Sequence, residues 1–222
     1  MIVAIDGPAG AGKSTVAREV ARRLGAAYLD TGAMYRALTL LAVQRGIAPS
    51  DGEALVALAR RYPVEIVPTG DGDRVRVDGG DVTAEIRTPD VAAQVSEVSA
   101  HAGVREQMVA AQRALMSRGD WVSDGRDVGS TVRPDADVKV FLTATPEERA
   151  RRRRAELAAR GVELDEAQVL EDVRRRDELD TSRAASPLRV AHGAVVIDSS
   201  DLDAGEVADR VMSLVSAFAA GG

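Results

Sequence analysis

A glycine-rich segment that carries a lysine lies close to the beginning of the sequence. Residues 7–14 read Gly-Pro-Ala-Gly-Ala-Gly-Lys-Ser, which matches the pattern G-x-x-x-x-G-K-[ST] in full. Glycines let successive backbone N–H groups turn inward around a phosphate. In this pattern Lys13 can reach the β- and γ-phosphates of a nucleotide, and Ser14 can ligate Mg²⁺. The segment therefore predicts a phosphate-binding loop for a nucleoside triphosphate.

The sequence on either side of this loop favours a binding loop over a chance glycine-rich turn. Residues 2–5 form a short apolar run, which is typical of a buried parallel strand. Residues 15–24 carry apolar side chains at helical spacing. A strand, a glycine loop and a helix form the arrangement in which a helix N-terminus helps to hold an anion.

A second group of charged residues follows the apolar run at residues 121–123. Asp124, Arg126 and Asp127 lie there in a segment whose glycines are residues 125 and 129. An acidic residue at a strand end near a phosphate loop can hold Mg²⁺ through water, so Asp124 is a candidate metal ligand. Asp-Gly is also common in ordinary turns. We favour a functional segment, because two glycines bracket opposite charges where parallel sheets collect their ligands.

Residues 30–36 lie at the end of the second predicted strand, at the same edge of the sheet. Thr31 and Gly32 predict a turn, and Arg36 lies near the start of the next helix. A guanidinium there can form paired hydrogen bonds to a phosphate. The same residues fit an N-cap threonine followed by a solvated arginine equally well. This stretch alone leaves both interpretations open.

Two arginine-rich segments follow later in the chain. Arg149 and the four consecutive arginines 151–154 fall on one predicted helix. Consecutive helical positions point around all sides, so we expect most of these arginines to be solvated or paired with glutamates and one or two to reach a phosphate. Arg176, Asp180 and Arg183 share a face if their segment is helical. They fit either a phosphate and ribose site or a surface salt-bridge ladder, the usual role of such charges.

The apolar pattern predicts an α/β fold that brings these segments to one edge. Five apolar runs indicate parallel core strands, at residues 2–5, 27–29, 121–123, 138–142 and 194–197. Helical patterns separate them, at residues 15–24, 34–45, 52–61, 91–117, 146–160 and 164–176, with a final helix from 203 to about 218. Strands that alternate with helices imply a doubly wound, five-stranded parallel sheet flanked by helices.

One segment interrupts this alternation. Residues 64–67, 74–77 and 81–82 are short runs joined by turn signals at residues 69–73 and 78–80. They predict a small antiparallel meander inserted between the second and third core strands. Because such a meander is too small to be stable alone, we expect it to pack on neighbouring helices.

Composition narrows the class of protein. The 222 residues are enough for one α/β domain with appended subdomains. The absence of Cys excludes a disulfide framework, a thiolate metal site and a Cys nucleophile. His101 and His192 lack metal-site spacing, so we expect both at the surface or in loops. The net charge of −6 argues against general nucleic-acid binding, whereas the arginine clusters indicate local anion sites.

We find no sign of a targeting segment or a membrane-spanning segment in the amino-acid sequence. Met1 is followed directly by the first strand and the loop, without an n-region, an h-region or a cleavage site. No stretch of 18 apolar residues is present. We therefore expect a soluble cytoplasmic protein with no membrane partner.

With these segments in order, the chain resembles the bacterial cytidylate kinase family essentially from end to end. The resemblance rests on residues 5–14 (IDGPAGAGKS), 29–36 (LDTGAMYR), 85–88 (EIRT), 124–129 (DGRDVG), 134–137 (PDAD) with 139–142 (KVFL), and 183–188 (RAASPL). A phosphate loop alone would not distinguish one family of nucleotide-binding proteins from another, whereas this ordered set does.

The resemblance implies a nucleoside monophosphate kinase built as a single domain in three parts. A core at residues 1–30, 119–145 and 188–222 binds ATP. Residues 31–118 form a subdomain for the nucleoside monophosphate, and this part includes the β meander. Residues 146–187 form a helical lid. The resemblance also implies a cytoplasmic monomer of pyrimidine nucleotide metabolism that binds neither nucleic acid nor membrane.

The resemblance further implies substrate contacts for individual residues. Ser96, Arg105 and Asp127 are expected to read cytosine, because a carboxylate accepts from its N4 amino group and an arginine donates to its O2 and N3. Uracil presents the opposite pattern at position 4 and is disfavoured. Arg176 and Asp180 are expected at the sugar, with Asp180 on the ribose hydroxyls. The other implied substrate-binding residues are Thr31 and the phosphate-binding Arg36, Arg126 and Arg183.

For catalysis, the resemblance implies Lys13, Arg126, Asp127 and Arg183. ATP is expected along Gly7, Pro8, Ala9, Gly10, Ala11, Gly12, Lys13, Ser14 and Thr15, with Ser14 and Asp124 as ligands of the cofactor Mg²⁺. The expected reaction is Mg²⁺-dependent transfer of the γ-phosphoryl group of ATP to CMP, and to dCMP. The attacking phosphate oxygen is already anionic, so positioning and charge neutralisation are sufficient.

Two other interpretations stay open. The nearest is another small-molecule P-loop kinase, acting on AMP, UMP or shikimate, against which Arg105 paired with Asp127 and the β insertion discriminate. A non-enzymatic nucleotide switch or nucleic-acid-binding module fits less well. The net charge is negative, and aromatic residues make up only 3% of the chain, which leaves few platforms for stacking bases.

Overall fold

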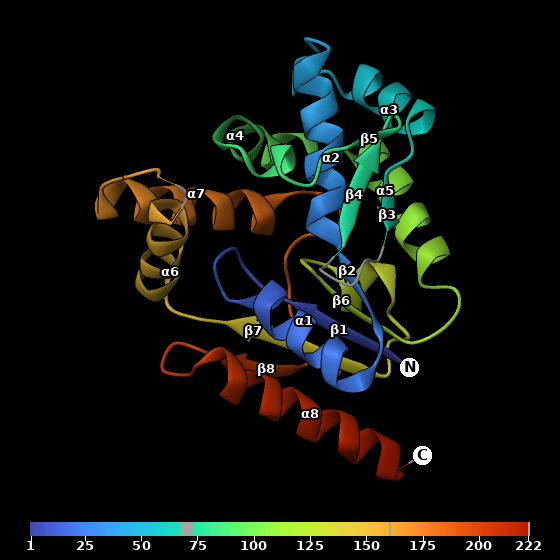
Figure 1. Cartoon of the computed structure of the whole chain (residues 1–222), viewed down its shortest axis with the longest axis vertical. Coiled ribbons are helices and arrows are strands. Elements are labelled where there is room, and N and C mark those ends of the chain that lie inside the picture. The colour runs from blue at the N-terminus through green and yellow to red at the C-terminus, as the bar shows by residue number, and fades with distance from the viewer. Residues whose placement is uncertain (68–72, 160, 222) are drawn as a thin grey trace.

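The computed structural model describes residues 1–67, 73–159 and 161–221. Its central sheet has five strands in the order β2-β6-β1-β7-β8, and all neighbours run parallel (Figure 1). These strands are β1 (Ile2–Asp6), β2 (Ala27–Asp30), β6 (Trp121–Gly125), β7 (Val138–Thr143) and β8 (Val195–Asp198). The predicted fold class and its five core strands are therefore confirmed.

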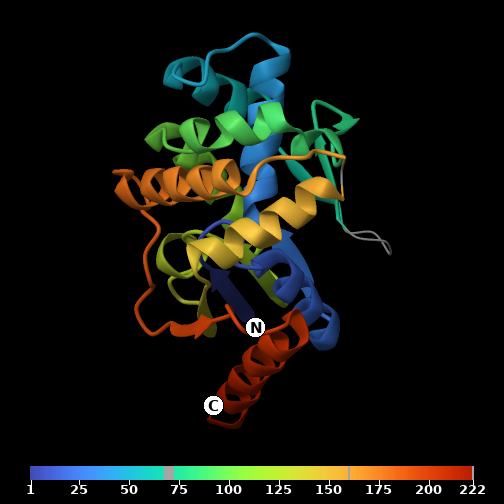
Figure 2. The same cartoon turned by 90° about the vertical axis from the view of Figure 1, so that its left-hand side faces the viewer.

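Both faces of the sheet are covered, because successive side chains of a strand point to opposite faces. Val3 and Ile5 of β1 pack in one cluster with α1 (Lys13–Leu24) and α8 (Ala204–Gly221). Ile2 and Ala4 belong to a second cluster on the other face. This two-sided burial explains why the strand reads as a continuous apolar run. Figure 2 shows α8 at the opposite end of the molecule from the helices of the second cluster.

The second cluster is built mainly by the segment between β2 and β6. It contains α2 (Thr31–Gln44), α3 (Gly52–Arg61), α4 (Pro89–Val98), α5 (Ala102–Leu115) and a 3₁₀ turn (Glu85–Arg87). The predicted meander is confirmed as a separate antiparallel sheet of β3 (Glu65–Val67), β4 (Arg74–Val77) and β5 (Gly80–Asp81). Val75 and Val77 anchor it in the same cluster as α2. Of the turn expected at residues 69–73, all but Asp73 lies outside the described residues.

The prediction of one helix over residues 91–117 is wrong. The chain forms α4 and α5, separated at Ser99, Ala100 and His101. The Ser99 hydroxyl donates to the carbonyl of Ser96, and His101 has the extended backbone angles φ −66° and ψ 121° that begin a new helix. The apolar spacing continues across the break, so periodicity alone could not detect it.

Two helices form a projecting unit at the side of the core, on the left of Figure 1. They are α6 (Pro146–Ala158) and α7 (Glu166–Ser182), which share the small buried cluster of Ala150, Val169 and Val173. Helix α7 extends beyond the predicted end at residue 176 and so carries Asp180. Within the ranges that the structure describes, each helix is too short or too polar to span a bilayer.

Candidate active site

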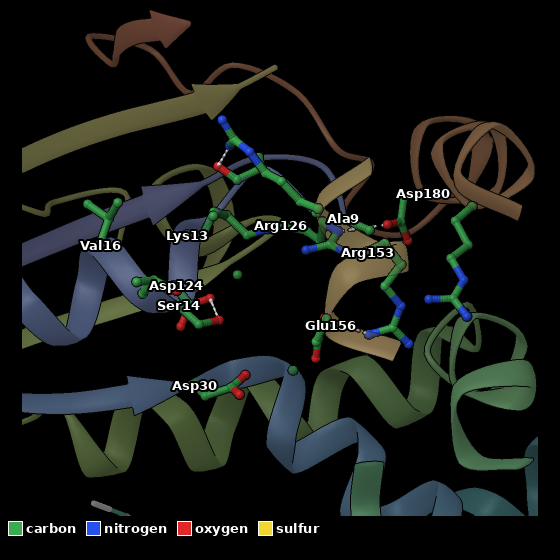
Figure 3. Close-up of a pocket in the computed structure, with 18 of the residues that line it drawn as sticks. Ala9, Lys13, Ser14, Val16, Asp30, Asp124, Arg126, Arg153, Glu156 and Asp180 are labelled. Atoms are coloured by element: carbon green, nitrogen blue, oxygen red, sulfur yellow. Dashed lines mark hydrogen bonds and ion pairs between the residues drawn. The ribbon is translucent and has the colours of Figure 1, made fainter. Parts of the chain in front are cut away.

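The carboxyl ends of the parallel strands open into a cavity of about 1040 Å³. Such an edge is where open α/β sheets bind ligands. Most of the predicted site residues line it: Ala9, Gly10, Ala11, Gly12, Lys13, Ser14, Thr15, Thr31, Arg36, Ser96, Arg105, Asp124, Arg126, Asp127, Arg176, Asp180 and Arg183. Gly7 and Pro8 belong to the loop without lining the cavity. Figure 3 shows Lys13, Ser14 and Asp124 on one side of it and Arg153, Glu156 and Asp180 on the other.

The phosphate loop connects the central strand β1 to α1. Gly12 has a φ of +88°, a conformation that favours glycine, and a Cβ at Gly7 would lie 1.9 Å from the carbonyl oxygen of Leu142. Lys13 is buried, and its Nζ donates to the carbonyl of Pro8 at 2.8 Å. Burial and the nearby Arg126 lower the pKa of Lys13 to about 7. Anionic phosphates in the loop would favour the charged ammonium again.

Ser14 and Asp124, the two predicted ligands of Mg²⁺, are in direct contact. The Ser14 hydroxyl donates to Asp124 Oδ2 at 2.9 Å, and the Tyr28 hydroxyl donates to Asp124 Oδ1 at 2.6 Å (Figure 3 shows the first contact). Burial and the neighbouring Asp30 raise the pKa of Asp124, while Lys13 opposes this shift. Sequence reasoning missed Tyr28, which fixes the carboxylate from β2.

This donor set fits Mg²⁺ better than a metal held by protein alone. Among the described residues, no three His, Asp or Glu side chains gather as a metal cage. Mg²⁺ usually binds through one or two protein oxygens together with water and substrate phosphates. One hydroxyl and one oriented carboxylate beside a phosphate loop meet that requirement.

Arg105 and Asp127 form a buried ion pair at the cavity wall. Arg105 Nη2 lies 2.6 Å from Asp127 Oδ2, and the side chains are 4% and 5% exposed. Arg105 also donates to the carbonyl of Ser99 at 3.2 Å, so the break between α4 and α5 helps to hold it. The guanidinium carbon lies 5.2 Å from the centroid of the Tyr35 ring, within cation–π range. The pair is therefore fixed before any ligand enters.

Other arginines in the cavity are held by carboxylates. Arg36 Nη2 lies 2.6 Å from Asp30 Oδ2, while Asp180 accepts from Arg126 Nε at 2.7 Å and from Arg183 Nη1 at 3.3 Å. Although burial opposes the shift, these two arginines hold the pKa of Asp180 below its usual value. The structure thus favours a buried cluster over the surface ladder that the spacing also allowed.

Several guanidinium nitrogens keep unused hydrogen-bonding capacity. Within the described residues, Arg36 Nε, Arg105 Nε and Arg183 Nη2 are buried and have no hydrogen-bond partner. Buried donors without partners are costly in a folded protein. Three such donors around one cavity indicate an anionic or acceptor-rich ligand.

Arg176 is held by groups of both α4 and α7. Its Nη2 donates to the carbonyl of Ala92 at 2.9 Å, and its Nε lies 3.1 Å from Asp172 Oδ2. It still lines the cavity, as does Ser96 on α4. Arg176 therefore also connects α7 to α4.

The turn expected at Thr31 and Gly32 is wrong, because both residues form the first turn of α2. Asp30, and not Thr31, caps this helix: its side chain accepts from the N–H of Ala33 at 2.9 Å. The buried Thr31 hydroxyl donates to the carbonyl of Asp124 at 2.8 Å. Arg36 is paired with Asp30 and is not a solvated side chain.

The arginines of α6 point in different directions, as expected. Arg149 is buried and binds Asp177 with two hydrogen bonds, of 2.9 and 2.6 Å. Arg151 and Arg154 pair with glutamates at the surface. The arginines of this run that line the cavity are Arg151, Arg152 and Arg153. The histidines lie outside it: His192 is exposed, and His101 Nε2 lies 2.8 Å from the carbonyl of Pro49.

The fold and the site together define a P-loop kinase. The shikimate kinase of Bacteroides thetaiotaomicron has the same fold, with a TM-score of 0.51 at 13% identity over 97% of this chain and 98% of that one. A family model described as cytidylate kinase matches residues 3–217.

Two curated relatives support this match. The cytidylate kinase of Bacillus pumilus is 50% identical over 210 residues, which cover 95% of this chain and 93% of the relative. That of Bacillus subtilis is 47% identical over 213 residues, which cover 96% and 95%. The chain belongs to the cytidylate kinase family.

Proposed function

We propose that the protein transfers the γ-phosphoryl group of ATP to the phosphate of CMP, and of dCMP, with Mg²⁺ as cofactor. The observation that carries the proposal is that the phosphate loop and the buried pair of Arg105 and Asp127 line one cavity. A donor nucleotide and an acceptor nucleotide can therefore bind in this cavity at the same time. Family membership supports the same reaction.

The pair of Arg105 and Asp127 is our candidate for recognition of cytosine. A carboxylate has more acceptor sites than its one bond to Arg105 uses, so Asp127 can accept from the N4 amino group. Arg105 retains a buried, unpaired Nε that can donate to a base acceptor. Ser96 adds a hydroxyl from α4. Uracil would place its O4 acceptor against the carboxylate, which disfavours it.

Three arginines are assigned to the acceptor phosphate. Arg36, Arg126 and Arg183 come from α2, from the segment after β6 and from the end of α7, and each is pre-oriented by an aspartate. Pre-orientation reduces the entropy lost on binding. Asp180 holds two of them and lines the same cavity as Thr31 and Arg176, so we assign it also to a ribose hydroxyl, from which it can accept. Acceptor phosphate and sugar thus share one carboxylate.

The donor side uses the phosphate loop from Gly7 to Thr15. Backbone N–H groups and Lys13 bind the phosphates of ATP, and Ser14 and Asp124 are the residues that would hold Mg²⁺. When bound, Mg²⁺ supplies charge neutralisation at the phosphate oxygens. The protein supplies orientation: Tyr28 and Ser14 fix the Asp124 carboxylate between them.

No protein nucleophile or base is required for this reaction. An anionic oxygen of the CMP phosphate attacks the γ-phosphorus of ATP, the bond from that phosphorus to the β,γ-bridging oxygen breaks, and ADP leaves. Lys13, Arg126 and Arg183 neutralise the charge around the transferring group. Residues 31–118 contribute Arg36, Ser96 and Arg105 to the acceptor site. The lid at residues 146–187 closes over both nucleotides and excludes water.

A substrate panel tests the proposal directly. ADP formation is measured with ATP, Mg²⁺ and each of CMP, dCMP, UMP, AMP and shikimate. We expect the highest kcat/KM with CMP or dCMP, and loss of activity by about 1,000-fold in Lys13→Met, in line with the loss of a group that stabilises the transition state. Preference for AMP, UMP or shikimate would assign the protein to another kinase activity. The absence of CMP-stimulated ADP formation would favour a nucleotide switch.

A further inference from the structure

A buried carboxylate lies outside the cavity and has no role in the reaction as proposed. Asp6 is the last residue of the central strand β1 and is 3% exposed. Its Oδ1 accepts from the backbone N–H of Val128 at 2.8 Å, and its Oδ2 accepts from that of Gly129 at 2.7 Å. Both oxygens are therefore used on two consecutive amides of one segment.

The position of Asp6 connects the two halves of the proposed site. Its own backbone leads directly into the phosphate loop at Gly7, and across the sheet it pairs with Gly125 at the end of β6. The two residues after Gly125 are Arg126 and Asp127, which we assign to the acceptor phosphate and base. The amides of Val128 and Gly129, which Asp6 binds, follow immediately. One carboxylate, at the end of the strand that leads into the phosphate loop, therefore holds the segment that carries Arg126 and Asp127.

The packing leaves this segment little freedom. A Cβ at Gly125 would lie 2.5 Å from Thr31 Oγ1, and a Cβ at Gly129 would lie 3.4 Å from Asp6 Oδ2. The two glycines that bracket Arg126 and Asp127 thus allow the segment to approach Asp6 and α2. The two hydrogen bonds of Asp6 fix the position of residues 125–129 in that space.

A carboxylate is a costly way to make these two contacts. Burial raises the pKa of Asp6 to about 6, in spite of both backbone hydrogen bonds. A buried charge lowers stability unless its interactions compensate. A carboxylate is, however, a side chain that accepts at both of its ends, which two adjacent N–H groups require.

We propose that Asp6 is a positioning residue for the acceptor: its two hydrogen bonds hold residues 125–129 so that Arg126 and Asp127 meet the acceptor nucleotide. This inference rests on the proposed function and deepens it. Asp6 touches neither nucleotide in this account. Substitution of Asp6 should therefore raise the KM for CMP while the KM for ATP stays close to that of wild type.

The chain offers a matched control at the other end of the same segment. Arg113 of α5 donates to the carbonyls of Thr131 and Val132, at 2.7 and 3.0 Å. It anchors the turn Val128–Val132 at its last two residues, which lie farther along the sequence from Arg126 and Asp127 than the amides held by Asp6. The N–H groups of these two residues donate to the carbonyl of Asp127 at 2.8 and 3.1 Å. Arg113→Met therefore removes an anchor of similar kind that lies farther from the acceptor residues.

The experiment compares Asp6→Asn with Arg113→Met and wild type. Asn keeps the size of Asp6 but accepts at only one end, so one amide loses its partner. We expect the KM for CMP to rise about tenfold in Asp6→Asn, the effect of losing one hydrogen bond to a charged group, with the KM for ATP changed by less than about twofold. In Arg113→Met both KM values should stay within about twofold of wild type.

Amide hydrogen exchange at Val128 and Gly129 supplies a second measurement that does not depend on turnover. We expect faster exchange at these two amides in Asp6→Asn than in wild type, with β1 unchanged. If the asparagine variant does not fold, Asp6→Ser serves in both measurements. Equal increases in the two KM values, an unchanged KM for CMP in a folded variant, or unchanged exchange would overturn the inference. A wild-type protein without CMP turnover would contradict the proposed function instead, and faster exchange in the variant would still report the anchoring.

Discussion

Asp127 illustrates how a single residue serves structure and selectivity together. Its carboxylate compensates the buried charge of Arg105, at 2.6 Å, and in our proposal also accepts from cytosine. Because the ion pair exists without a ligand, the base meets a site that is already oriented. Selectivity then depends on whether position 4 of the base donates or accepts a hydrogen bond.

The first prediction concerns Asp127→Asn. The amide can present an N–H group toward a base, so the penalty against uracil should shrink while the acceptor for the cytosine amino group is weakened. We expect kcat/KM for CMP to fall about 100-fold and the preference for CMP over UMP to narrow, as measured by steady-state kinetics with both substrates.

Asp135→Asn is the control, because this carboxylate is 67% exposed and pairs with Arg133 at the surface. Asp135→Asn should leave kcat/KM for CMP and the preference for CMP over UMP within about twofold of wild type. An unchanged ratio of CMP to UMP in a folded Asp127→Asn variant would contradict the assignment of Asp127 to the base. A thermal melt establishes folding, since Arg105 loses its charged partner in this variant.

The second prediction is a pH dependence that originates at Asp6. Its folded pKa of about 6 lies above the ordinary value of 3.8, so its contribution to stability is fully present below pH 3.8 and is lost as the pH rises through 6. Relative to Asp6→Asn, wild type should lose about 2 to 3 kcal/mol of unfolding free energy between pH 4 and pH 8. Urea unfolding of both proteins across this range measures the difference. A constant difference would contradict a raised pKa at Asp6.

At the scale of elements, breaks and ends of helices decide where functional side chains lie. The interruption between α4 and α5 gives Arg105 a carbonyl partner in Ser99 and places Ser96 and Arg105 on separate helices that face one cavity. The apolar spacing predicted a continuous helix here, because the stop depends on Ser99 and His101 geometry that periodicity does not record. The strands were predictable because two-sided burial requires unbroken apolar runs.

Helix α6 is joined to the phosphate loop through Arg149. This buried guanidinium donates to the carbonyls of Ala144 and Ala9, at 3.0 and 3.2 Å, and to Asp177 of α7. Sequence reasoning placed Arg149 among the possible lid arginines without distinguishing its role. In a run of arginines, only the three-dimensional packing shows which one turns inward.

The third prediction follows from this connection. Arg149→Ala leaves Asp177 without its cation and two carbonyls without a donor, so we expect the free energy of unfolding to fall by about 3 kcal/mol. Arg154→Ala, on the same helix, removes only an exposed pair with Glu166 and should change it by less than about 1 kcal/mol. Urea unfolding of the two variants tests this, and equal effects would argue against a linking role for Arg149.

At the scale of the whole molecule, the site is assembled from segments that are far apart in the sequence. The phosphate loop and the charged residues after β6 could be predicted, because both follow apolar strands of one parallel sheet. Arg105 and Ser96 came only from the family resemblance, because their helices reach the cavity through tertiary packing. Tyr28 and Asp6 were missed, although Tyr28 lies within the strand predicted at residues 27–29 and Asp6 directly follows the strand predicted at residues 2–5.

The central claim is that one cavity passes a phosphoryl group directly from ATP to CMP. In the most direct measurement, the protein is incubated with Mg²⁺, CMP and ATP that carries a label in its γ-phosphate. The products that contain the label are identified, and ADP is quantified in parallel. We predict that the label appears in CDP in a one-to-one ratio with ADP, and that Lys13→Met lowers the rate of formation of both products by about 1,000-fold. Label released as inorganic phosphate, or ADP formation that does not depend on CMP, would contradict the account.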